Sequence, residues 1–213
     1  MNLIEIIYMS VLLTCFLIGL IFLPYFKTPT KLVLIYITIS FFNECLGYYS
    51  LYYSAEKKVR VLEHNLYLCI YFIILTLYFS NIIIYTKKRI AFIASICTFF
   101  LSFFYSIQTI NQTFHYQQFI ILALSFAFYS LIYFKQLLET EEAILENPNF
   151  WIVTGILFFH GGYFFLSGFI SFIASNDLEL ARKLFKINNI LNIIYYSLII
   201  YGFLCQRRLM KLS

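Results

Sequence analysis

Long apolar segments, separated by short polar breaks, divide the whole chain. Seven such segments extend over residues 3–26, 31–53, 64–85, 90–110, 116–137, 150–174 and 186–206. Each reaches the length of about 20 residues that a membrane-spanning helix needs, and none shows the alternating pattern of a membrane β-barrel strand. The pattern therefore predicts an all-α fold, a polytopic transmembrane bundle of seven helices that forms a single transmembrane domain over residues 1–213.

The breaks between the segments contain signals for the ends of helices. Asn147-Pro148 combines a capping residue with a proline at the first helical position, which is typical of a helix start. Within the helix that follows, Gly155 and Gly162 are seven residues apart, as are Gly161 and Gly168. Small residues at such spacing predict close helix packing.

The distribution of Lys and Arg over the breaks predicts the orientation. With the N-terminus outside, nine basic residues fall on the inner side: Lys27, Lys31, Lys87, Lys88, Arg89, Lys135, Arg207, Arg208 and Lys211. Six fall on the outer side: Lys57, Lys58, Arg60, Arg182, Lys183 and Lys186. Because cytoplasmic loops carry an excess of basic residues, the count favours an N-out, C-in topology.

A polar stripe interrupts the second apolar segment. Its members lie three or four residues apart, on one face of a helix: Tyr36, Ser40, Asn43, Glu44 and Gly47. A carboxylate inside a membrane span costs about 2.5–3.5 kcal/mol on insertion scales. We therefore expect Glu44 to face the protein interior and to have a polar partner there.

Other segments carry polar residues near the same, outer side of the predicted membrane. His160 lies near the midplane of the sixth segment, and His115 lies at the outer end of the fifth. We predict a polar, aromatic-lined cavity that opens towards the extracytoplasmic side. Its candidate ligand-binding residues are Asn43, Glu44, His64, Asn65, Tyr67, His160, Asn188, Asn192 and Tyr195.

Each of these residues also has a structural interpretation. Glu44 could be a structural carboxylate that is hydrogen-bonded to Asn192 or to a tyrosine. His160 could be a neutral histidine that shares hydrogen bonds between helices, and Asn188 and Asn192 could join neighbouring helices. The sequence leaves both interpretations open.

Composition strengthens the membrane interpretation and excludes several functions. The chain is 62% hydrophobic and 12% charged, with a mean hydropathy of +0.84, whereas soluble domains are about 25% charged. The net charge of +5 is spread over short loops, which argues against nucleic acid as a partner. The cysteines lie in apolar segments without a C-x-x-C pair, which predicts small packing residues rather than disulfides: Cys15, Cys45, Cys69, Cys97 and Cys205.

No catalytic motif is present in the sequence. A zinc site needs at least three ligands. The candidate ligands would have to come together from separate segments: His64, His115 and His160, with Glu44 or Glu63. We therefore expect a protein that is not an enzyme and that needs no cofactor or metal.

Several functions remain compatible with this pattern. The favoured one is a small-molecule or lipid-sensing membrane protein that acts through a membrane or cytoplasmic partner. The alternative is a structural or accessory protein that works by lateral contacts, through the acidic segment 139–146 and the basic tail QRRLMK. An oligomeric pore or transporter and a metal-dependent intramembrane hydrolase are less favoured.

Four stretches carry a resemblance to a known group of proteins: FFNECLGYY, HNLYLCIYF, NPNFWIVTGILFF and INNILNIIYYSLIIYGFLC. Together they resemble uncharacterised seven-span integral membrane proteins of Bacteroidota. The resemblance implies a multi-pass protein of the bacterial inner (plasma) membrane, and it implies no activity and no catalytic residues. One departure is the third segment, where IYFIILTLYF lacks the acidic residue expected in that group.

Overall fold

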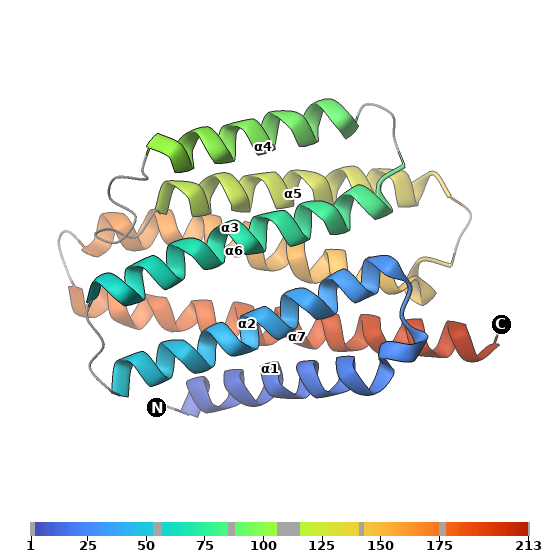
Figure 1. Cartoon of the computed structure of the whole chain (residues 1–213), viewed down its shortest axis with the longest axis horizontal. Coiled ribbons are helices and arrows are strands. Elements are labelled where there is room, and N and C mark those ends of the chain that lie inside the picture. Colours follow the sequence, from blue (N-terminus) through green and yellow to red (C-terminus); the bar gives the residue numbers. More distant parts are fainter. Residues whose placement is uncertain are drawn as a thin grey trace. The chain divides into compact units, whose positions relative to one another are not determined.

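The computed structural model describes residues 3–52, 57–84, 88–105, 116–140, 143–174 and 178–212, and throughout these ranges all regular structure is helical. The helices are shown in Figure 1: α1 (Leu3–Phe22), η1 (Leu23–Tyr25), α2 (Thr28–Tyr52), α3 (Lys57–Ile82), α4 (Lys88–Tyr105), α5 (Tyr116–Leu138), η3 (Ile144–Glu146), α6 (Pro148–Ala174) and α7 (Leu178–Leu212). The predicted all-α class is confirmed.

Six of the predicted spans correspond to helical stretches that are long and apolar enough to cross a bilayer. They are Leu3–Tyr25, Thr28–Ser50, Lys58–Ile82, Gln118–Leu138, Pro148–Ser167 and Lys186–Lys211. The described apolar part of α4 is shorter, at Phe92–Phe104. The end of the predicted fourth span, residues 106–110, lies outside the described residues, so a seventh crossing stays a prediction.

The face that α3 exposes is apolar. Leu66, Ile70, Ile73 and Leu77 are all exposed, and they follow one another at the three- and four-residue spacing of a single helix face. The buried face of the same helix includes Leu68, Phe72, Leu75 and Phe79. A helix that is apolar on its exposed face as well as on its buried face suits contact with lipid rather than water. The chain therefore has the character of a helical membrane protein.

The described helices form two compact units. Unit 1 comprises Met1–Lys27 and Phe126–Ser213, and unit 2 comprises Thr28–Ser125. In unit 1, α7 packs against both α1 and α6, and in unit 2, α3 packs against α2 and α4. The prediction of a single transmembrane domain stays a prediction.

Aromatic pairs set the direction of α1 against α7 in unit 1. The rings of Tyr8 and Tyr196 stack with centroids 6.1 Å apart. Beyond the end of α1, the ring of Phe26 lies 4.7 Å from that of Phe203. Residue numbers increase together along both helices, so α1 and α7 are parallel.

Glycines allow α6 and α7 to approach closely in the opposite, antiparallel direction. A Cβ atom at Gly162 would lie 2.8 Å from Leu191, and one at Gly202 would lie 2.7 Å from Ile152 and 3.0 Å from the carbonyl oxygen of Pro148. The prediction of close packing at Gly162 is therefore confirmed. The same prediction is wrong at Gly161, where a Cβ atom would meet nothing within 4 Å, because this position lies on a different face of α6.

The start of α6 matches the cap that the sequence predicts. The side-chain oxygen of Asn147 accepts a hydrogen bond from the backbone N–H of Asn149 at 2.9 Å, and another from the hydroxyl of Tyr133 at 3.3 Å. The second bond ties the start of α6 to the end of α5 within unit 1. The indole N–H of Trp151 donates to the carbonyl of Leu145 at 2.9 Å, which fixes η3 against the first turn of α6.

Candidate functional site

A polar contact joins α2 and α3 in the middle of their apolar faces. The hydroxyl of Ser40 lies 2.8 Å from the hydroxyl of Tyr67. Ser40 is buried among apolar residues of α2, so an unpaired hydroxyl there would be unfavourable. Tyr67 supplies the partner from the facing helix.

Glu44 and Tyr36 complete this group, which we call the Glu44–Tyr67 cluster (Tyr36, Ser40, Glu44 and Tyr67). A second side-chain hydrogen bond links Tyr36 to Tyr67, and the Glu44 carboxylate interacts electrostatically with the same tyrosine. The residues of α2 that take part are four apart, on one helix face. The predicted polar stripe of α2 thus faces α3, and a hydrogen bond from Glu44 to a tyrosine stays a prediction.

Stacked rings support the cluster from one side. The ring of Tyr71 lies 5.0 Å from that of Tyr36 and stacks on that of Tyr67 at 5.8 Å, with an interplanar angle of 3°. Tyr36 and Tyr71 are buried. Because rings in such contact limit one another's orientation, the Tyr67 ring is held in position for its hydroxyl to meet Ser40.

The other side of the cluster is accessible. Asn43, Glu44 and Tyr67 all keep part of their surface exposed. One turn beyond Glu44, a Cβ atom at Gly47 would meet no atom within 4 Å. Glu44 therefore combines an electrostatic interaction with Tyr67 and an open flank.

The remaining candidates in unit 2 lie on α3. Asn65 is buried, and His64 is partly exposed one turn before Tyr67. They belong to the same unit as Asn43, Glu44 and Tyr67. The structure thus brings the candidates of α2 and α3 into one helix pair.

His160 occupies a closed aromatic environment in unit 1. It is fully buried, and its ring lies 5.2 Å from that of Phe126 and 5.1 Å from that of Phe159, both in edge-on contact. Its Nδ1 atom lies 2.8 Å from the carbonyl oxygen of Ile156, in its own helix. This hydrogen bond lies within α6, and a hydrogen bond from His160 to another helix stays a prediction.

The candidates of α7 also lie in unit 1. The amide of Asn192 donates to the carbonyl oxygen of Asn188 at 3.0 Å, within the same helix. This contact differs from the expected bond between helices, because the amide reaches its own i−4 carbonyl. Tyr195 is buried, with its ring stacked on Phe159 at 5.1 Å.

The nine candidates therefore fall into two groups. Asn43, Glu44, His64, Asn65 and Tyr67 belong to unit 2, and His160, Asn188, Asn192 and Tyr195 belong to unit 1. A single cavity that joins both groups, including the pairing of Glu44 with Asn192, stays a prediction. His115 lies outside the described residues.

A pocket of about 440 Å³ lies in unit 1, at the end of the unit where α1 and α7 end and α6 begins. We call it the Lys27–Glu146 pocket; its lining includes Lys27, Glu146, Asn147, Asn149, Gln206 and Leu209. Sequence reasoning missed this site, since its residues come from three distant parts of the chain. The available signals were the Asn147-Pro148 helix start and the polar Gln206 near the end of an apolar segment.

Within the described ranges, no group of three or more His, Cys, Asp or Glu side chains is placed to hold a metal ion. No protein-family model, curated protein or solved structure matches the chain.

Proposed function

We propose that the protein is a multi-pass membrane protein that binds a small molecule or a lipid at the Glu44–Tyr67 cluster and acts through a partner protein. One observation carries the proposal: the partly exposed carboxylate of Glu44, in an apolar span, interacts electrostatically with Tyr67, whose hydroxyl bonds to Ser40. Ionisable residues within spans are rare and costly, and each is by default a hypothesis for a functional site.

The chemistry of the cluster suggests the type of ligand. An ionised carboxylate accepts charge-assisted hydrogen bonds, and the tyrosine rings provide faces that attract cations. A ligand with an ammonium group or another hydrogen-bond donor would complement Glu44, while its apolar part contacts the spans. The open flank at Gly47 offers space for such a group.

The test uses the full chain purified in detergent, with co-purifying molecules identified by native mass spectrometry. We expect the wild type to retain a small molecule or lipid that Glu44→Gln loses, while both accumulate equally in the membrane. Glu139→Gln is the matched control, because Glu139 is exposed at the end of α5 and outside the cluster.

Two results would contradict the proposal. The first is an unchanged set of bound molecules in Glu44→Gln. The second is failure of Glu44→Gln to accumulate together with rescue by Glu44→Asp, which indicates a structural carboxylate. Such a role would favour the accessory function by lateral contacts.

A further inference from the structure

The Lys27–Glu146 pocket lies at the level where the apolar spans of unit 1 end. The first span ends at Tyr25, another begins at Pro148, and the last ends at Lys211. One turn into α6, the rings of Trp151 and Tyr201 pack with centroids 4.5 Å apart. Trp and Tyr are enriched at membrane–water interfaces. These positions put the pocket at the depth of lipid headgroups.

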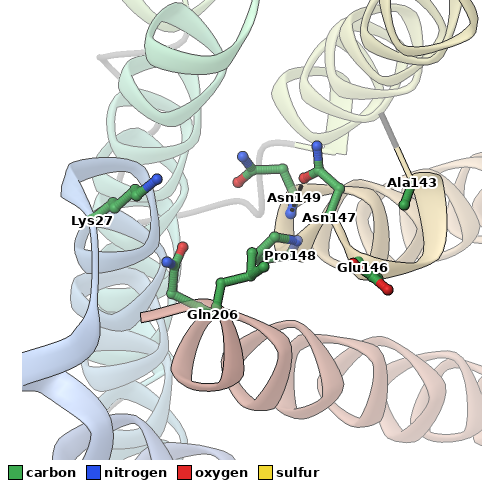
Figure 2. A pocket seen from close by; sticks show the side chains of 8 residues that line it. Lys27, Ala143, Glu146, Asn147, Pro148, Asn149 and Gln206 are labelled. Carbon is green, nitrogen blue, oxygen red and sulfur yellow. Dashed lines mark hydrogen bonds between the residues drawn. The ribbon is translucent and has the colours of Figure 1, made fainter. Parts of the chain in front are cut away.

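The described lining of the pocket carries one positive and one negative side chain, held apart. Figure 2 shows Lys27 and Glu146 on opposite sides of the pocket, with Gln206 and Asn149 between them. Among the residues that the structure describes, no other charged residue lines the pocket, and no ion pair joins these two. Separated charges of opposite sign complement a ligand that carries both signs itself.

The backbone N–H groups at the start of α6 do not account for the preference for a ligand that carries both charges. The N–H of Asn149 is bonded to the Asn147 side chain, the N–H of Phe150 is bonded to the Asn147 carbonyl at 3.1 Å, and proline has no N–H. Arg207, from α7, lies over the ring of Phe22 at 4.5 Å and does not line the pocket. The charge preference therefore comes from the ammonium of Lys27 and the carboxylate of Glu146.

We propose that this pocket binds a phosphate ester that carries a primary ammonium group, with the phosphate beside Lys27 and the ammonium beside Glu146. The volume of about 440 Å³ is within the range of about 300–1,000 Å³ of ligand sites. The side-chain amides between the two charges can donate to phosphate oxygens. A primary ammonium donates hydrogen bonds to a carboxylate, which a quaternary ammonium cannot do. Phosphatidylethanolamine and soluble glycerophosphoethanolamine share this chemistry.

The test is native mass spectrometry of the full chain in detergent, titrated with phosphatidylethanolamine, phosphatidylglycerol or phosphatidylcholine of the same acyl chains, and with glycerophosphoethanolamine. We expect the wild type to bind phosphatidylethanolamine about fivefold or more tightly than the other two lipids, a size that fits exposed charge pairs. The protein could instead bind glycerophosphoethanolamine and none of the lipids. If both charge variants then lose this binding, the result supports the same headgroup chemistry with a soluble ligand.

The variants separate the two charges. Lys27→Met should weaken binding of phosphatidylethanolamine and phosphatidylglycerol alike. Glu146→Gln should remove the preference for phosphatidylethanolamine and leave phosphatidylglycerol binding intact. The controls Lys135→Met and Glu139→Gln change the same charges at exposed positions of unit 1 outside the pocket, and should have no effect. Equal binding of all three lipids with no glycerophosphoethanolamine binding, or a preference that survives Glu146→Gln, would overturn the proposal.

Discussion

Ser40 of α2 and Tyr67 of α3 share a hydrogen bond of 2.8 Å within two predominantly apolar spans. Tyr67 also interacts electrostatically with Glu44. A single tyrosine hydroxyl therefore connects a contact that joins two helices with the only carboxylate of α2.

A double-mutant cycle of Ser40→Ala and Tyr67→Phe should reveal this connection. Hydrogen bonds between membrane helices have coupling energies of about 0.6 kcal/mol on average and up to about 1.7 kcal/mol, so we expect a coupling in that range. The measurement is reversible unfolding in mixed micelles. Strictly additive effects of the two substitutions would mean that the bond does not contribute to the pairing of α2 with α3.

The contact of α6 with α7 should depend on Gly202. In Gly202→Ala the new methyl group meets Ile152 at 2.7 Å and a backbone oxygen at 3.0 Å, so we expect a loss of about 1–3 kcal/mol in unfolding free energy, as for overpacked cores. The matched control is Gly47→Ala, where the space is open. There, the better helix propensity of alanine should leave stability unchanged or raise it by up to about 1 kcal/mol. Thermal unfolding in detergent compares the two, and equal effects would contradict the close packing.

The stability of the protein should depend more on the volume of the side chain at position 160 than on its polarity. His160 is fully buried between two phenylalanine rings, and its Nδ1 atom bonds to the carbonyl oxygen of Ile156 in its own helix. We expect His160→Ala to cost about 2–5 kcal/mol through the cavity it leaves. His160→Leu, of similar volume, should cost less than about 1.5 kcal/mol. If both variants are stable but both lose a ligand in the native mass spectra, His160 has a binding role instead.

Reporter fusions to the two ends of the chain test the predicted topology. With seven crossings and N-out, C-in orientation, a fluorescent protein after Ser213 should fluoresce in the cytoplasm, and alkaline phosphatase at the N-terminus should be active outside it. Both ends on the same side would mean that α4, whose described apolar part is Phe92–Phe104, does not cross. Neutralising Lys87, Lys88 and Arg89 should increase the inverted fraction, because basic loops set orientation.

The helices themselves could be predicted from the sequence. All the signals used for the helices depend on neighbours along the chain. They are the apolar segments, the Asn147-Pro148 helix start and the four-residue spacing of Ser40 and Glu44. A helix in an apolar solvent satisfies its backbone internally, so length and hydropathy are sufficient to indicate it.

Tertiary structure alone decided which side chain meets which. In lipid, apolar residues cover both the exposed and the buried face of a helix, so the apolar pattern does not identify the packing face. Gly162 packs closely and Gly161 does not, although each has another glycine seven residues away in the sequence. Lys27, Glu146 and Gln206 line one pocket because α1 and α7 end, and α6 begins, at the same end of unit 1. The sequence does not indicate that these helix ends lie together, because their positions result from the packing of complete helices.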